Sequence, residues 1–436
     1  MFEKAFVMSL PTQGEPEQGR SDDPPGNPYR FHSAAAPIVA TGNWLVKFEG
    51  DIAPHVRTKL LQDSLGGNSH IASTSDYRST ALNLTGLVQM ADAVVLDRLG
   101  VAVLKGTEDI QSRSAELEDM PGITRVMPEF FVFSYHEAGD SIHEDTAEVT
   151  WGIDAIGASR CSLSGGGVKL GILDSGFDKT HPDFVERTVQ MWSAFGCAGD
   201  DFQGHGTHCA GTAAGPHATT ERMRYGVASG SDLHIYKVLN DKGYGTDGDV
   251  LAGIERALED GCDVISMSFG RGVATGTMPH SIYDEVASAA LDVGVLLIAA
   301  AGNSSSRDVG HIAPVDYPAN SPSIMAVGAV DSRLRIANFS NGSASAAGGS
   351  AIGGVDIAAP GAGVFSAVPM PRQYRRLRGT SMAAPHVAGV ACLWAEMDAS
   401  LRGRALWTAL TANAKSLRGA GGDVGAGLVQ APFTER

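Results

Sequence analysis

Apolar runs and amphipathic stretches alternate along the first part of the chain from about residue 43. Apolar, β-branched runs predict strands, and apolar residues at helical spacing predict helices. The predicted strands are NWLVKFEG (43–50), the strand pair AVVLDRLGVAVLKG (93–106) and GITRVMPEFFVF (122–133), and the predicted helices are PHVRTKLLQDSLGG (54–67) and DIQSRSAELEDM (109–120). The order of strand, helix, strand, strand, helix and strand is typical of a small ferredoxin-like α+β domain, which we place at residues 37–135.

The second part of the chain has a different pattern, in which short apolar runs are separated by longer helical stretches. The runs are VKLGILD (168–174), HIYKVL (234–239), VISMSF (264–269), VLLIAAA (295–301) and IMAVGAV (324–330). Their continuous apolar character is typical of strands buried on both faces of a parallel sheet. Between two of these runs, the apolar spacing after Thr246 and Asp247 predicts a capped helix. Residues 151–436 are therefore predicted to form a doubly wound, mostly parallel α/β domain.

Two polar stretches flank the predicted small domain. Most of residues 1–36 are rich in Pro, Gly, Asp and Ser, which predicts a disordered N-terminal arm. Residues 136–150 are polar and acidic, which predicts a linker between the two domains.

The composition narrows the classes of function. The chain of 436 residues carries a net charge of −16, which repels nucleic acids and anionic membranes, so we expect neither as a partner. Its five cysteines show no CxxC spacing, which argues against a disulfide scaffold or a zinc knuckle. The longest apolar run, VGVLLIAAA (293–301), is far shorter than the roughly 20 residues of a membrane span. The first residues lack the pattern of a secretory signal, so we expect a cytoplasmic protein, with export by another route as the alternative.

Three polar residues lie near the carboxyl ends of predicted strands or at the start of a helix, where parallel sheets place their functional crevice. Asp174 ends an apolar run and is either a cap for the next turn or the partner of a cationic group. His205, in GHGTHCAGT, opens a helix beside His208; this pair could bind zinc, but no HExxH glutamate accompanies it, and a packed His208 is favoured. Asn303, in AAAGNSSS, either forms a turn or directs its amide at a developing oxyanion.

Ser381 lies in RGTSMAAPHVAG, where helical propensity begins after Gly379. It is either an ordinary helix cap or a reactive hydroxyl, because the free N–H groups and the dipole at a helix N-terminus stabilise negative charge. With Asp174, His205 and Asn303, it completes the set of groups that acyl transfer needs. The order Asp, His, Ser differs from that of the α/β-hydrolases, whose GxSxG elbow is also missing here.

Five segments carry a family resemblance. The segments LGILDSGFDKTHPDF, GHGTHCAGT, VISMSFG, AAAGN and GTSMAAPHVAG resemble, in this order, the signature segments of the subtilisin-like serine proteases, and Cys209 gives the histidine segment a proteinase K-like form. The resemblance extends from about Trp151 to GAGLVQA near the C-terminus. It implies a serine endopeptidase with Ser381 as the nucleophile, His205 as the general base and then acid, and Asp174 as the group that orients His205. Asn303 and the Ser381 N–H would form the oxyanion hole.

The same resemblance implies where a peptide or protein substrate binds. An extended substrate would pair with an edge segment of the enzyme by strand addition, and two further segments would form the walls of the primary pocket. The residues are Gly243, Tyr244 and Gly245 at the edge, Ser268, Phe269 and Gly270 on one wall, and Ala300, Ala301 and Gly302 on the other.

The small domain resembles the inhibitory propeptide of these proteases. The implied protein is a zymogen in which the chain's own propeptide blocks the cleft until it is cut between Tyr135 and Thr150. Catalysis would need no cofactor. A structural calcium is implied near Asp183 and Asp356.

Two other functions remain open on the same fold. One is a transferase that passes the acyl group to an amine and macrocyclises peptides, and the other is a non-catalytic binding protein. The basic run RQYRRLR (372–378) adds a hypothesis about specificity. Either it is a solvated face, or Arg378 or Arg376 favours acidic residues on the leaving-group side of the substrate.

Overall fold

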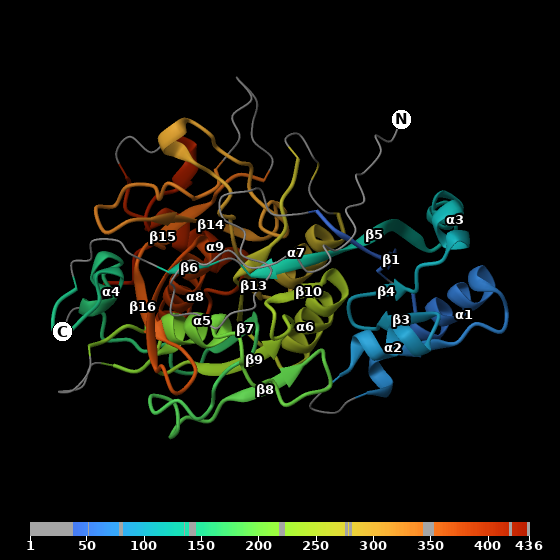
Figure 1. The fold of residues 1–436 in the computed structure, drawn as a ribbon, viewed down its shortest axis with the longest axis horizontal. Helices are drawn as coiled ribbons and strands as arrows, with labels where there is room; N and C mark the ends of the chain where they lie inside the picture. The colour runs from blue at the N-terminus through green and yellow to red at the C-terminus, as the bar shows by residue number, and fades with distance from the viewer. Residues whose placement is uncertain are drawn as a thin grey trace, which may run out of the picture.

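The structure, a computed structural model, describes residues 38–50, 52–77, 82–134, 136–138, 145–217, 223–274, 278, 281–342, 353–417 and 421–433. The predicted arm at residues 1–36 therefore lies outside the described residues, as does the middle of the predicted linker. Figure 1 shows a large domain with a central sheet and, beside it, a small domain formed by the first described strands and helices.

A seven-stranded sheet forms the centre of the large domain, and all its strand pairs are parallel. Its order is β15 (Ile357–Pro360), β14 (Met325–Val330), β13 (Leu296–Ala300), β11 (Val264–Met267), β7 (Lys169–Asp174), β9 (Asp232–Lys237) and β8 (Gln190–Ser193). All five predicted strands are present. The strands β8 and β15 were not predicted, because each has only four residues.

Helices cover both faces of this sheet, which confirms the doubly wound α/β class. Successive strand residues point to opposite faces, so that Ile172 packs in one hydrophobic core and Leu173 in the other. The first core includes α5 (His205–Ala214), α8 (Thr380–Met397) and α9 (Gly403–Ala412), and the second includes α6 (Asp247–Glu259) and α7 (Ser281–Asp292). A short helix, α4 (Trp151–Ala155), precedes the sheet.

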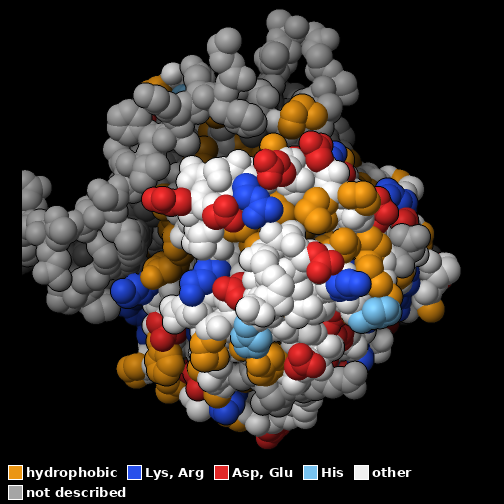
Figure 2. Space-filling model, turned by 90° about the vertical axis from the view of Figure 1, so that its right-hand side faces the viewer, with side chains coloured by type: hydrophobic (Ala, Val, Ile, Leu, Met, Phe, Trp, Pro, Cys, Tyr) orange, Lys and Arg blue, Asp and Glu red, His pale blue; other side chains and the backbone are white. Residues whose placement is uncertain are grey.

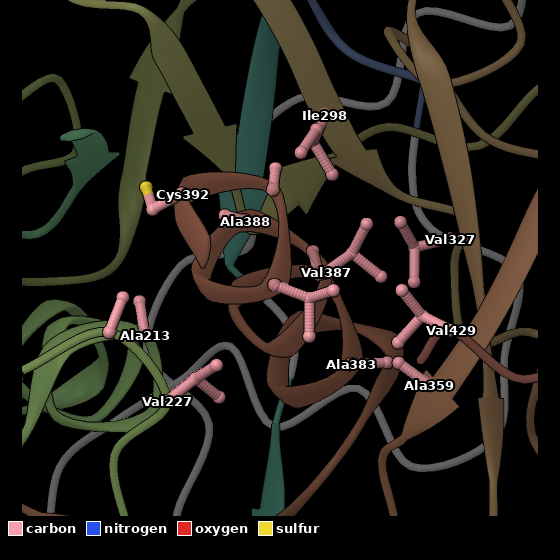
Figure 3. Close-up of a cluster of buried hydrophobic side chains, with 14 of the residues drawn as sticks. Ala213, Val227, Ile298, Val327, Ala359, Ala383, Val387, Ala388, Cys392 and Val429 are labelled. Atoms are coloured by element: carbon pink, nitrogen blue, oxygen red, sulfur yellow. The ribbon is translucent and has the colours of Figure 1, made fainter. Parts of the chain in front are cut away.

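Small side chains allow α8 to lie close to its neighbours. In Figure 3, Val387 and Ala388 of α8 lie between Ala213 and Val227 on one side and the strand residue Val327 on the other. A Cβ at Gly389 would lie 2.5 Å from the Val227 Cβ and 2.8 Å from the Ala213 carbonyl oxygen, so α5 and α8 could not approach this closely with a larger residue there. This packing fixes the N-terminus of α8, where Ser381 lies.

The small domain contains every strand and helix that the sequence predicts. These are β1 (Ala40–Phe48), α1 (Pro54–Leu65), β3 (Ala93–Leu96), β4 (Val101–Leu104), α3 (Glu108–Glu118) and β5 (Ile123–Ser134), and the sheet order is β5-β1-β4-β3. Two elements were missed: β2 (Ile71–Ser73), which extends the sheet, and α2 (Leu84–Met90). Both are too short to carry a clear period in the sequence.

Strand β5 extends the sheet of the small domain onto the large domain. Its first part pairs with β1, and its last four residues lie between two edge strands of the large domain, β10 (Tyr244–Thr246) and β12 (Phe269–Gly270). Figure 1 shows β5 running out of the small domain across the large one. Further along the chain, β6 (Glu137–Ala138) pairs with β17 (Tyr374–Arg378), which in turn pairs with β16 (Val364–Ala367).

The small domain also contacts α6. The backbone N–H of Gly248 donates to Glu129 Oε1 at 3.0 Å, and that of Phe130 donates to Asp247 Oδ2 at 3.0 Å. At the other end of α6, Glu255 Oε1 accepts from the backbone N–H of Arg98 at 2.7 Å. The small domain therefore caps the N-terminus of α6 with a carboxylate, as the helix dipole favours.

Figure 2 shows the outer end of the molecule, on the side of the small domain, where acidic and basic side chains lie interspersed. Among the described residues, no helix is both long enough and apolar enough to span a lipid bilayer.

Candidate active site

Asp174 and His205 lie together at the carboxyl end of the central sheet. Asp174 is the last residue of β7 and His205 is the first of α5, and both side chains are completely buried. His205 Nδ1 lies 2.7 Å from Oδ1 and 2.9 Å from Oδ2 of Asp174, so this nitrogen carries the proton and Nε2 is left as an acceptor. A Cβ at Gly206 would lie 2.2 Å from the Gly176 carbonyl oxygen, so this close approach of the two segments requires glycine.

Asp201 holds the turn that precedes α5. Its Oδ1 accepts from Ser175 Oγ at 2.9 Å and from the Gly204 N–H at 2.7 Å, and its Oδ2 accepts from the Thr207 N–H at 2.9 Å. It therefore ties the residue after Asp174 to the first turn of the histidine helix. The sequence analysis missed Asp201, although an acidic residue shortly before a helix start is a recognisable capping signal.

Ser381 is the second residue of α8 and is buried. Its Oγ donates to the Ser268 carbonyl oxygen at 2.9 Å, and Ser268 Oγ donates back to the Ser381 carbonyl oxygen at 2.9 Å. Cys209 joins this residue to the histidine, because its thiol lies 3.7 Å from His205 Nδ1 and 3.4 Å from the Ser381 carbonyl oxygen. Within the described part of the chain, His205 Nε2 is buried and has no hydrogen-bond partner.

Asn303 follows β13 and contacts the first residue of α8. Its Oδ1 accepts from the Thr380 N–H at 2.8 Å and from Thr380 Oγ1 at 2.9 Å. These two donors fix which end of the amide faces the helix, so the NH₂ group is the end left to donate elsewhere. Thr380 Oγ1 also accepts from the Gly302 N–H at 3.0 Å. Sequence reasoning missed this positioning role of Thr380.

Cys209 and His208 do not behave as reactive or metal-binding groups. Among the described residues, the side chains of Asp174, His205 and Cys209 are the group that could hold a metal ion, because their possible ligand atoms lie within 4.8 Å of one another. Burial, and then the charge of Asp174, raises the pKa of the Cys209 thiol well above its usual range, so it stays protonated. His208 Nε2 lies 3.1 Å from the Val364 carbonyl oxygen, and burial lowers its pKa to about 3, as expected for a packed, neutral histidine.

The predicted edge segment and one of the two predicted wall segments pair with the last residues of β5. Tyr244 and Gly245 of β10 pair with Phe133 and Val132, and the Ser134 N–H donates to the Gly243 carbonyl oxygen at 2.9 Å. On the other side, β12 pairs Phe269 and Gly270 with Ser134 and Phe133. Ala300, Ala301 and Gly302 lie at the end of β13, next to Asn303.

The chain then passes over the histidine. The ring of His136 lies 5.0 Å from the ring of His205, measured between centroids. Burial, and then the nearby His205, lowers the pKa of His136 well below its usual range, so it is neutral. One residue on, Glu137 forms an ion pair with Arg378, and Asp145 forms one with Arg376. Residues on both sides of position 135 therefore contact the candidate active site: Ser134 pairs with Phe269, and His136 lies against His205.

The two residues expected near calcium are engaged with protein groups. Asp183 accepts from the hydroxyls of Tyr225 and Tyr374, the latter at 3.0 Å. Asp356 accepts from the Ala326 N–H at 2.7 Å, and burial raises its pKa to about 7. Calcium prefers six to eight oxygen ligands with ionised carboxylates, and these contacts do not favour that set.

A buried aspartate–histidine pair next to a serine at a helix N-terminus, on a doubly wound parallel sheet, defines a serine hydrolase. Residues 165–427, more than half of the chain, match the profile of the Subtilase family. The chain belongs to this family.

Similar proteins agree with this assignment. Alkaline protease of Shouchella clausii is 33% identical over 348 residues, which cover 77% of this chain and 85% of the relative. Subtilisin Savinase of Lederbergia lenta is 35% identical over 291 residues, which cover 66% of this chain and 99% of the relative. Among solved structures, a cold adapted subtilisin-like serine proteinase aligns with a TM-score of 0.54 at 30% identity, over 66% of this chain and 99% of that chain. The protein is therefore a serine endopeptidase that acts on peptide substrates, and the family generally needs no cofactor for catalysis.

The expected cytoplasmic location is wrong. The relatives are secreted, extracellular subtilisins, which points away from the cytoplasm. The prediction rested on the lack of a recognisable signal in the first residues, and a weak pattern there does not determine the compartment.

Proposed function

We propose that Ser381 is the nucleophile of the endopeptidase, His205 its general base and then acid, and Asp174 the group that orients His205. The observation that carries this assignment is the bonded Asp174–His205 pair, which Cys209 connects to Ser381 at the start of α8. The proton on His205 Nδ1 leaves Nε2 able to accept the Ser381 proton.

The first chemical step requires a small movement of the serine. Ser381 Oγ, which now donates to the Ser268 carbonyl oxygen, would rotate to donate to His205 Nε2. As Oγ attacks the carbonyl carbon, its proton moves to Nε2, and the carbonyl oxygen becomes an oxyanion. The Asn303 amide and the Ser381 N–H at the positive end of α8 would stabilise this charge.

The remaining steps return the enzyme to its starting state. His205 Nε2 would give its proton to the leaving nitrogen as the peptide bond breaks, which leaves an acyl ester on Ser381. Water would then lose a proton to Nε2 and attack the ester through the same oxyanion. Collapse of this second intermediate releases the acid and returns the proton to Ser381.

An extended substrate would bind between β10 and β12. Each of the two strands pairs through its main chain with residues 131–134. A substrate strand in their place would make the same hydrogen bonds, which depend little on its side chains.

The small domain at residues 37–135 would act as an inhibitory propeptide, and the protein would be a zymogen. Support comes from the last residues of β5, which fill the substrate position, and from His136, which lies over His205. We place the cut between Tyr135 and His136, the bond that lies between the paired Ser134 and the histidine. Tyr135 itself lies outside the described residues. A structural calcium near Asp183 or Asp356 stays a prediction.

Replacing the nucleophile tests the assignment. We expect Ser381→Ala to fold and to lose peptide hydrolysis by at least about 10³-fold, because the remaining groups stabilise charge but form no ester. Ser400→Ala, at an exposed position beyond the end of α8, is the matched control and should keep full activity. Equal activity of Ser381→Ala and the wild type would refute the assignment.

A further inference from the structure

Two glycines on opposite sides of the primary pocket converge on one buried acid, Asp316. A Cβ at Gly270, which belongs to β12, would lie 3.4 Å from the Asp316 Cβ. A Cβ at Gly302, after β13, would lie 2.4 Å from Asp316 Oδ2. The Asp316 N–H donates to the Ala301 carbonyl oxygen at 2.9 Å, which fixes the residue beneath both walls. A Cβ at either position would also collide with another neighbour, 2.4 Å from the Tyr317 carbonyl oxygen at Gly270 and 2.3 Å from Asn341 Nδ2 at Gly302, so only glycine lets the two segments pass this close to Asp316.

The carboxylate of Asp316 is only partly satisfied. The residue is 2% exposed, and Oδ1 accepts from Asn341 Nδ2 at 3.2 Å. In the described part of the chain, Oδ2 is buried with no hydrogen-bond partner. Burial raises the pKa of Asp316 to about 8, although Arg271 and then Asn341 oppose this change. A buried polar atom without a partner is costly and calls for a ligand that supplies one.

Arg271 does not supply that partner: no hydrogen bond joins it to Asp316, and among the described residues its Nε is also buried without a partner. Its guanidinium lies between two aromatic rings, 4.2 Å from the ring centre of Phe130 and 4.1 Å from that of Tyr317. Its charge is shared with Asp247, whose Oδ2 is 4.0 Å away. Asp316 is thus left to interact with whatever side chain enters between Gly270 and Gly302.

We propose that Asp316 is a specificity-determining residue at the floor of the primary pocket, and that it selects substrates whose residue before the cut bond ends in a hydrogen-bond donor. Arginine and lysine are preferred first and tyrosine next, over methionine and phenylalanine. This proposal rests on the proposed function. An apolar side chain in the pocket would bury Oδ2 without a partner, whereas an ammonium, guanidinium or phenol group would donate to it.

The chain's own sequence agrees with this preference. The residue between Ser134 and His136, which would enter the pocket, is Tyr135. Its phenol is a donor, and phenylalanine, which differs by that one hydroxyl, is not.

Matched peptides test the proposal on the wild-type enzyme. Peptides copied from residues 131–138, FVFSXHEA, carry Arg, Lys, Tyr, Met or Phe at X, and kcat/KM is measured for each. We expect Arg to exceed Met, and Tyr to exceed Phe, by about 10-fold or more, since a hydrogen bond to a charged group is worth roughly 10- to 100-fold. Ratios near one, with the peptides cut, would overturn the proposal and leave the proposed function intact. No cleavage of any peptide would instead count against the proposed function.

Asp316→Asn gives a second readout, with Asp308→Asn as its control. Both substitutions replace a carboxyl group of the same loop with an amide, but Asp308 is exposed. We expect the preference for Arg over Met to fall by about 10- to 100-fold in Asp316→Asn and to stay unchanged in Asp308→Asn. An equal preference in both variants would refute the role of Asp316. If Asp316→Asn does not fold, the kcat/KM ratios of the wild-type enzyme on the matched peptides test the proposal by themselves.

Discussion

At the scale of single residues, the site consists of side chains whose orientation is fixed by neighbours that the sequence did not reveal. The motifs around Asp174, His205, Asn303 and Ser381 were visible in the sequence because each follows an apolar run or opens a helix. Asp201, which fixes the turn before His205, was not, because its partners come from two separate segments. Capping signals reveal that a turn exists, whereas long-range hydrogen bonds appear only in the fold.

At the residue scale, we predict the kinetic effect of removing the Asn303 amide. Its amide is held by two donors from Thr380, so its NH₂ group is positioned before substrate binds. We expect Asn303→Ala to lower kcat by about 10²- to 10³-fold with little change in KM, because the lost donor acts in the transition state. Steady-state kinetics on one peptide measures this. A rise in KM at constant kcat would show that Asn303 binds substrate and not the oxyanion.

At the scale of elements, the longer strands were predicted correctly, but their partners across the domains were not. Alternating and continuous apolar runs identify β5 and β11, since both patterns are local. The insertion of β5 between β10 and β12 joins segments more than 100 residues apart, and β10 and β12 have three and two residues. Such short edge strands carry no period of their own, so only the folded chain reveals the pairing.

The pairing of β6 with β17 indicates which substrate residue the basic run 372–378 would contact. Glu137, two residues after the proposed pocket residue, forms an ion pair with Arg378, and the two side chains are 41% and 46% exposed. Because an exposed pair contributes little, we expect only about a two- to five-fold preference for Glu over Gln at this substrate position. Arg378→Ser should abolish the preference.

Peptides FVFSYHXA with Glu, Gln or Lys at X measure this effect. Arg372→Ser is the matched control, because Arg372 belongs to the same basic run but precedes β17. The effect should weaken at high salt, since exposed charges are screened. If Arg378→Ser keeps the wild-type order of the three peptides, the basic run is only a solvated face.

At the scale of the whole molecule, we expect the stability of the contact between the two domains to depend on pH. Glu255 accepts from the backbone N–H groups of Arg98 and Leu99 in the small domain, and burial raises its pKa to about 7. The folded state therefore binds a proton that the unfolded state, with a glutamate pKa near 4.3, releases earlier. Stability from this group is fully present below that lower pKa and is lost as the pH rises towards 7.

Replacing Glu255 with an uncharged residue tests the direction of this pH dependence. In a Ser381→Ala background, which keeps the chain intact, we expect Glu255→Gln to melt higher than its parent by an amount that grows between pH 5 and pH 7 and then levels off. Thermal unfolding at several pH values measures the difference. A difference that shrinks as the pH rises would show that the ionised carboxylate stabilises the contact.

The most direct test of the account is the fate of the full-length chain. Wild type and Ser381→Ala are purified in parallel, and intact mass, the new N-terminus and peptide hydrolysis are followed over time. The account predicts that the wild type shortens to a chain beginning at His136 and gains peptidase activity, while Ser381→Ala keeps its full mass and stays inactive. A folded wild type that neither shortens nor cleaves peptides, or a Ser381→Ala chain that is cut at the same bond, would contradict it.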